Sequence, residues 1–328
     1  MIISDTTPIH YRNYINIGRW ILLQERFKEV SLLLLSNEIQ FVPLKGLYFN
    51  SLVYPENNPR PLNDIDIVIK REQYISTCKL LLENGFRLEP QLGYFERALE
   101  IPVDHWPTGL SFTKPGSGFY LDLQWHFVEH WFIPAFNIDF ESIWNRVEPA
   151  NEKAKPLWKW QLSIQDTLAH LCLHCSKDGM YNLKTYRDLD LYIRQLPQSW
   201  NWDLFLDLVN QWQITTIAWQ VFQILDHFHK TPFPKEIISE LSPSPLRQRL
   251  LNELVPVSEV FSTNPNFGKR YSKILKLVQI QKPLKIFTII SKVIFPGNDW
   301  IIGRYGKKVS IIYHWSHIAK RFFDKNNK

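Results

Sequence analysis

The chain has 328 residues, of which 45% are hydrophobic and 21% charged, and its formal net charge is +6. This length suffices for two domains with cores of their own, and the composition excludes an intrinsically disordered protein. Three cysteines are too few for a disulfide framework, and no apolar run reaches the roughly 18 residues of a transmembrane helix. The first residues lack the layout of a signal peptide, so a cytoplasmic protein is expected.

The first part of the chain mixes helical and extended patterns, separated by turns rich in proline, glycine and asparagine. Helices are predicted over residues 15–38, 47–53 and 72–84, the last of them ending at Gly85. Strands are predicted over residues 39–44, 65–69, 86–88, 94–101, 110–113 and 119–127.

The second part of the chain is predicted to be helical, over residues 161–176, 183–195, 202–212, 215–229 and, interrupted by Pro283, 274–295. The expected fold is therefore α+β. A mixed β-sheet domain with flanking helices, residues 1–138, is followed by an all-helical domain, residues 139–328, which forms the opposite wall of a cleft.

Two aspartates, Asp64 and Asp66, stand two positions apart in an apolar, β-branched run. In a strand such residues project from the same face, and two like charges side by side favour a cation between them. Hard oxygen ligands suit Mg²⁺ or Mn²⁺. Asp122 lies in a second alternating strand, and it could join the same site if the two strands are neighbours. A pair of solvated aspartates on an edge strand, with Asp122 a lone surface residue, is the alternative.

Lys45 and Gly46 stand where a strand turns into a helix. A glycine lets the backbone approach a phosphate closely, the helix N-terminus favours an anion, and Lys45 could reach a β- or γ-phosphate. A plain turn with an exposed lysine is the alternative. Arg60 could be a second phosphate ligand or a salt-bridge partner of the aspartates.

This ordered set, Leu44-Lys45-Gly46, Arg60 and Asp64-Ile65-Asp66, resembles the signature of the nucleotidyltransferase superfamily with the DNA-polymerase-β-like fold. The chain resembles in particular a bacterial family of uncharacterised nucleotidyltransferases, over roughly residues 30–320. Residues 121–125, 166–174 and 183–189 resemble that family's Asp-Leu-His-Trp strand, its helix with two histidines and the helix that follows. Gln124 departs from the pattern because the family commonly has histidine there.

The resemblance implies transfer of a nucleoside monophosphate from an NTP, with ATP the expected donor, to a hydroxyl or phosphate of an acceptor, and release of pyrophosphate. It implies two Mg²⁺ or Mn²⁺ ions held by Asp64, Asp66 and Asp122, with Asp122 also able to activate the acceptor. A small molecule, a peptide, a protein or an RNA end could be the acceptor. A catalytically inactive nucleotide-binding or scaffold protein, and a toxin-like transferase acting on tRNA, are the alternatives.

His170 and His174 are four positions apart in a predicted helix and therefore share one of its faces. Zinc could use this spacing, but no third ligand is evident. A polar cluster at the domain junction, with Lys184, Arg187 or Asp188, is the preferred interpretation. Such a cluster would either line the cleft or satisfy a buried network.

Lysine and arginine are concentrated in residues 269–328. A basic region of this kind favours a phosphate-bearing partner such as a nucleotide, a nucleic acid or an anionic lipid, and a solvated cationic face is the alternative. Because Pro283 breaks the pattern, an ordinary surface helix is the preferred interpretation of its first part.

Overall fold

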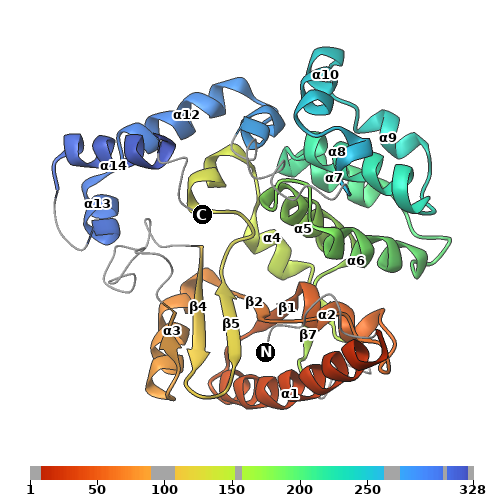
Figure 1. The fold of residues 1–328 in the computed structure, drawn as a ribbon, viewed down its shortest axis with the longest axis vertical. Coiled ribbons are helices and arrows are strands. Elements are labelled where there is room, and N and C mark those ends of the chain that lie inside the picture. The colour runs from red at the N-terminus through yellow and green to blue at the C-terminus, as the bar shows by residue number, and fades with distance from the viewer. Residues whose placement is uncertain (1–8, 90–107, 152–156, 262–273, 306–308, 324–328) are drawn as a thin grey trace.

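The computed structural model describes residues 9–89, 108–151, 157–261, 274–305 and 309–323 (Figure 1). The strand predicted over 94–101 lies outside these residues. A mixed five-stranded sheet has the order β1-β2-β5-β4-β3, in which β2 and β5 are parallel and the other neighbours antiparallel. The strands are β1 (Phe41–Leu44), β2 (Ile65–Ile69), β3 (Arg87–Leu88), β4 (Gly109–Lys114) and β5 (Phe119–Gln124).

Among the described residues, three α-helices belong to the sheet part: α1 (Ile9–Ser36), α2 (Lys45–Leu52) and α3 (Tyr74–Glu83). Helix α1 crosses one side of the sheet, where the Phe27 ring meets the Phe41 ring edge-on at 5.8 Å. Helix α3 ends before Gly85, whose φ of +83° is the left-handed conformation expected after a helix terminus. The predicted helix and strand ends of the described residues here lie within about three residues of those observed, except that α1 begins at Ile9 rather than at residue 15.

The second part of the chain is mainly helical but not all-helical as predicted, because it adds a sheet of two strands, β6 and β7, that are too short to show alternation in the sequence. Its elements are α4 (Phe140–Asn145), β6 (Glu148–Pro149), β7 (Trp160–Gln161), α5 (Ile164–Lys177), α6 (Leu183–Arg194), α7 (Asp203–Trp212), α8 (Thr215–Ile224), α9 (Glu236–Glu240), α10 (Pro245–Leu254), α12 (Pro283–Ile294), α13 (Asn298–Tyr305) and α14 (Ile311–Phe323). The helix predicted over 215–229 ends its α-helical part at Ile224 and continues as a π-helical segment.

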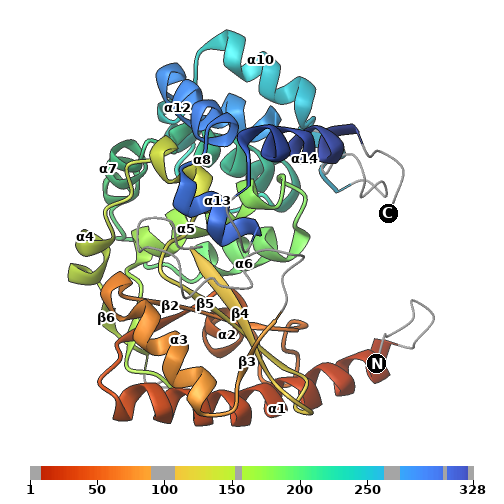
Figure 2. The ribbon, with the colours of Figure 1, turned by 90° about the vertical axis from the view of Figure 1, so that its left-hand side faces the viewer.

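Along the long axis of the molecule, α1, the sheet and the helices α5 to α8 follow one another in both views (Figures 1 and 2). One apolar core extends from the sheet into these helices. The predicted fold class, a mixed sheet with flanking helices followed by a helical part, is confirmed, whereas the division at residue 138 stays a prediction. Among the described residues, no helix combines the length and apolar character that crossing a membrane requires.

Candidate active site

Two of the predicted aspartates lie side by side on neighbouring strands. In the parallel pair of β2 and β5, Asp66 is opposite Asp122. Side chains opposite one another on adjacent strands project from the same face, and Asp64, just before β2, precedes Asp66 by two positions. The alternating residues Ile65 and Ile67 have no exposed surface. The strand pairing therefore brings the three carboxylates to one face while the isoleucines hold the strand in the core.

Lys45 turns from the end of β1 toward this acidic face. Its φ of +49° is uncommon for a residue with a side chain, and its Nζ lies 2.5 Å from Oδ1 of Asp66. Burial lowers the pKa of Lys45, but the charges of Asp66, Asp122 and Asp64 outweigh it, so the pKa is raised overall. Gln124 donates a second hydrogen bond to the same Asp66 oxygen at 2.9 Å. Lys45 is therefore a fixed positive charge among the carboxylates rather than an exposed lysine.

The acidic face raises the pKa of two of its members. Burial raises the pKa of Asp122, the charge of Asp66 raises it further, and a hydrogen bond from the Ser111 hydroxyl opposes the shift. Asp64 reaches the solvent, yet the pKa of its carboxyl group is raised by partial burial and then by Asp66. Burial is the largest cause of both pKa shifts and the like charge of Asp66 adds to it, and such a set of carboxylates favours a bound cation.

Gly46 is required by the packing around it. A Cβ at this position would lie 1.9 Å from Cδ2 of Leu62 and 2.8 Å from Nη2 of Arg60. The loop that carries Arg60 therefore packs directly on the first turn of α2. Asn50 of α2 completes this contact, because its side chain accepts from the Arg60 backbone N–H at 2.9 Å and donates to the Arg60 carbonyl at 3.1 Å.

Arg60 pairs with an aspartate of the helical part and not with the sheet aspartates. Its Nη2 lies 3.3 Å from Oδ2 of Asp188 on α6, and the Tyr54 hydroxyl donates to Oδ1 of Asp188 at 2.9 Å. Burial raises the pKa of Asp188 to about 6, although Arg60 and Tyr54 oppose the shift. The buried Arg60 Nε finds no acceptor among the described residues, so this guanidinium keeps a donor for another oxygen.

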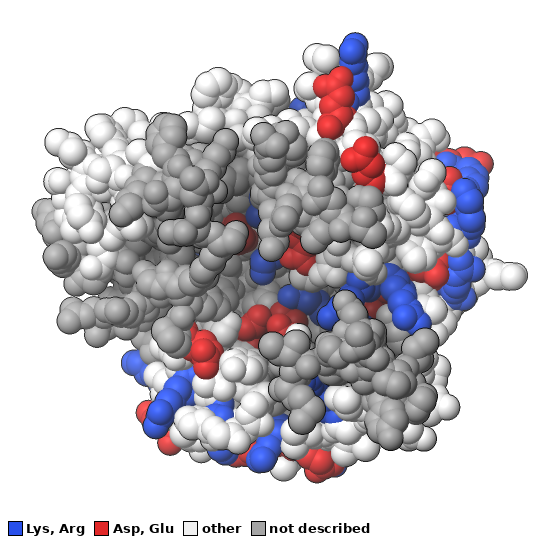
Figure 3. All heavy atoms as spheres, viewed as in Figure 1, with Lys and Arg blue, Asp and Glu red and all other residues white. Residues whose placement is uncertain are grey.

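Lys184 adds a further positive charge near this pair. The pKa of Lys184 is lowered overall, first by burial and then by the charge of Arg60, although the charges of Asp64 and Asp188 oppose this shift. In the space-filling view, acidic and basic side chains gather in the middle of the face, where the sheet part and the helical part meet (Figure 3). The acidic side chains of the sheet thus lie near cationic groups that could bind phosphate.

His170 and His174 lie on the face of α5 that adjoins this region. Their rings are parallel within 12° with centroids 6.5 Å apart, and a small cavity is lined by both Lys45 and His170. Burial, followed by the charge of Lys45, holds the pKa of each histidine well below its usual range. Both imidazoles are therefore neutral at physiological pH, and His174 Nε2 lies 3.4 Å from Oδ2 of Asp178.

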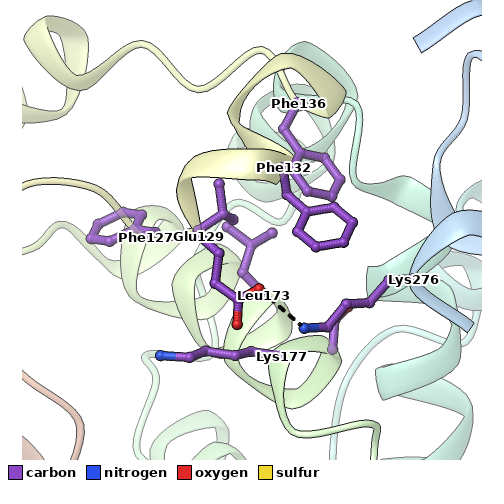
Figure 4. Close-up of a pocket in the computed structure, with 9 residues that line it drawn as sticks. Phe127, Glu129, Phe132, Phe136, Leu173, Lys177 and Lys276 are labelled. Carbon is purple, nitrogen blue, oxygen red and sulfur yellow. Dashed lines mark ion pairs between the residues drawn. The ribbon is translucent and has the colours of Figure 1, made fainter. Parts of the chain in front are cut away.

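A small cavity beside the C-terminal half of α5, lined in part by Leu173 and Lys177, contains no nucleotide-sized space. It has a volume of about 30 Å³, and Glu129 and Lys276 form an ion pair at 3.6 Å on its wall (Figure 4). Phe132 and Phe136 provide its apolar side. A volume of this size holds one or two water molecules.

Within the described ranges, no three or more His, Cys, Asp or Glu side chains are already arranged to hold a metal ion. This outcome gives zinc at His170 and His174 no support. It applies equally to the three aspartates, where the ammonium group of Lys45 contacts the Asp66 oxygen that a cation would bind.

Several residues that build this region were not expected from the sequence. Ser111 lies opposite Asp122 in the antiparallel pair of β4 and β5, and Tyr54 and Asn50 orient Asp188 and Arg60. Only the strand register could have indicated Ser111. Tyr54 and Asn50 could not be recognised without the fold, because tyrosine and asparagine are common in loops and short helices.

A mixed sheet that carries paired aspartates beside a strand-to-helix turn is consistent with a nucleotidyltransferase-like fold. Residues 11–230 match the family described as "Uncharacterised nucleotidyltransferase", and the chain belongs to this family. The resemblance noted in the sequence is thereby confirmed over residues 11–230, whereas its expected extension to about residue 320 stays a prediction. No curated protein matches the chain.

Proposed function

We propose that the chain is a metal-dependent nucleotidyltransferase, which moves a nucleoside monophosphate from an NTP, expected to be ATP, to an acceptor hydroxyl or phosphate. The observation that carries this proposal is the register of β2 and β5, in which Asp66 is opposite Asp122 with Asp64 two positions away. Membership of the nucleotidyltransferase family supports the general activity.

The donor set suits Mg²⁺ or Mn²⁺. Three carboxylates supply hard oxygen ligands, and burial together with mutual repulsion raises the pKa of Asp64 and Asp122. A divalent ion would relieve this repulsion, as Lys45 does in part. Asp64, Asp66 and Asp122 would hold the metal, which when bound would neutralise phosphate charge and polarise the reacting phosphorus–oxygen bonds.

The side chains around the aspartates would orient the nucleotide. Lys45 would exchange Asp66 for a phosphate oxygen, and Arg60 and Lys184 would bind the remaining phosphates. The acceptor oxygen forms a bond to the α-phosphorus while the bond between the α-phosphorus and the bridging oxygen breaks, and pyrophosphate leaves with that oxygen. When the acceptor is a hydroxyl, Asp122 would receive its proton, and Ser111 would keep Asp122 in position.

Transfer from α-labelled ATP in the presence of magnesium tests this proposal, with a bacterial extract as the source of acceptors. We expect Asp66→Asn and Asp122→Asn to lower the transfer of label by about a hundredfold or more, since each removes a carboxylate that would hold the metal. Asp207→Asn, on the exposed face of α7, is the matched control and should retain full transfer.

Equal transfer by the wild-type protein and Asp66→Asn would contradict the proposal. Magnesium-dependent nucleotide binding without any transfer would instead favour the catalytically inactive alternative. Transfer confined to the tRNA fraction would favour the toxin-like alternative. Circular dichroism of each variant separates loss of activity from loss of fold.

A further inference from the structure

The helix α12 is apolar on two faces, and the described residues cover only one of them. On the covered face, Ile289 is 3% exposed and packs against the 3₁₀ helix His130–Ala135. On the other face, Leu284 and Phe287 are 80% and 69% exposed. Ile290 and Ile294 continue this exposed face at helical spacing. A helix that is apolar all round normally has both faces covered.

The exposed apolar face continues from α12 onto α14. Phe295 follows α12 directly and is 64% exposed, and its ring meets the Trp315 ring edge-on at 5.7 Å. The indole N–H of Trp315 donates to the Ile294 carbonyl at 2.6 Å, which ties the two helices together. Both ribbon views place α12, α13 and α14 together at one side of the helical part (Figures 1 and 2). The apolar residues therefore form one surface.

Positive charge accompanies this surface. Residues 269–328 contain 14 Lys and Arg against two Asp, a net charge of +12, whereas the chain as a whole carries +6. No acidic residue occurs between Glu259 and Asp299. Lys282 and Lys292, near the two ends of α12, are exposed. We use the name C-terminal surface for the exposed side chains of Leu284, Phe287, Ile290, Ile294, Phe295 and Trp315 together with Lys282 and Lys292.

We propose that the C-terminal surface binds the interface of a membrane that contains anionic phospholipids, with α12 lying in the plane of the headgroups. Apolar side chains on one face with lysines beside them are the combination that such an interface binds, through the acyl chains and the lipid phosphates respectively. Trp315 has the amphipathic ring that suits the headgroup level. This binding stands apart from the nucleotide site and does not depend on its assignment.

Charge and side-chain type favour a membrane over the other partners. Two copies of a surface from a segment of net charge +12 repel each other, which opposes self-association. A single-stranded nucleic acid stacks its bases on aromatic rings, whereas Leu284, Ile290 and Ile294 offer aliphatic groups. An anionic bilayer satisfies the aliphatic and the cationic parts together.

Co-sedimentation of the full chain with vesicles tests the proposal. Vesicles of phosphatidylcholine with phosphatidylglycerol should bind the protein, and vesicles of phosphatidylcholine alone should bind it more weakly. Leu284→Gln with Phe287→Gln should weaken binding by about tenfold or more, since two exposed apolar side chains no longer enter the interface. Lys282→Gln with Lys292→Gln should weaken binding to the anionic vesicles by about tenfold or more.

The matched control is Leu246→Gln with Leu250→Gln on α10, where the two leucines are 70% and 42% exposed, and it should bind as the wild type does. All these positions lie at the surface, so the variants should fold, which circular dichroism verifies. Three outcomes would each overturn the proposal: a wild-type protein that ignores anionic vesicles, an α12 apolar variant that binds them unchanged, or binding to RNA in place of vesicles.

Discussion

At the scale of single residues, the candidate site is a set of charged side chains that the fold holds in contact with one another and partly shielded from water. Asp66 has Lys45 and Gln124 as hydrogen-bond partners, and Asp122 has Ser111. Asp188, on the helical side, is 1% exposed and depends on Arg60 and Tyr54. Each of these three carboxylates thus has a hydrogen-bond or ion-pair partner that offsets part of the free-energy cost of burying its charge.

The raised pKa of Asp188 predicts a pH-dependent contribution to stability. The pKa of Asp188 is about 6 in the folded state and its ordinary value is 3.8, so between these values the folded state binds more protons than the unfolded state. This contribution is therefore present at low pH and is lost as the pH rises through 6. From pH 7 to pH 5, Asp188 should add about 1 kcal/mol to the free energy of unfolding.

Chemical denaturation of the wild type and Asp188→Asn at these two pH values measures this contribution. The wild type should gain about 1 kcal/mol more than the variant on acidification, because asparagine does not titrate. An equal change in both proteins would show that Asp188 titrates normally in the fold.

The sequence predicts the carboxylates of the site better than it predicts their partners. Asp64 and Asp66 can be found from alternation in one strand, and Asp122 from alternation in another. The partner of Arg60 could not be found, because Asp188 is far along the chain and only the packing of α6 against α2 brings the two together. That Lys45, Gly46 and Arg60 bind the nucleotide stays a prediction.

At the scale of elements, the turn from β1 into α2 sets the geometry of the site. The turn directs Lys45 to Asp66, and Gly46 admits Leu62 and the Arg60 loop against α2. Sequence patterns placed this turn within a few residues. They could not show that Gly46 is needed for contact with Leu62, because that contact depends on the path of the intervening loop.

Gly46→Ala should lower the free energy of unfolding by about 1–3 kcal/mol, because the new methyl group overlaps Leu62 and Arg60. Gly18→Ala, on the exposed face of α1 with nothing within 4 Å of the new Cβ, is the matched control. It should raise stability by about 0.5–1 kcal/mol, since alanine favours a helix interior. Equal effects of the two changes, measured by urea denaturation, would contradict the packing described for Gly46.

At the scale of the whole molecule, the sheet part and the helical part meet through a shared core and through the pair of Arg60 and Asp188. The pair joins the loop before β2 to α6, and it does so beside the acidic face. Fold class could be predicted from the change of hydrophobic periodicity along the chain. The close packing of the two parts could not be predicted, because hydrophobic periodicity carries no information about contacts between distant elements.

A double-mutant cycle measures the contribution of this connection. Arg60→Met should lower the free energy of unfolding by about 3–5 kcal/mol, because it leaves Asp188 buried without its cation. Arg60→Met combined with Asp188→Asn should be less destabilising than the sum of the single changes, with a coupling energy of about 1–3 kcal/mol. Simple additivity of the two changes would show that the pair does not hold the two parts together.

We propose above all that the carboxylates beside Lys45 form a magnesium-dependent nucleotide site. Calorimetric titration with a non-hydrolysable ATP analogue, with and without magnesium, tests it most directly. We predict binding that requires magnesium in the wild type and in Asp207→Asn, and no such binding in Asp66→Asn. Binding that is indifferent to magnesium, or that persists unchanged in Asp66→Asn, would contradict the claim.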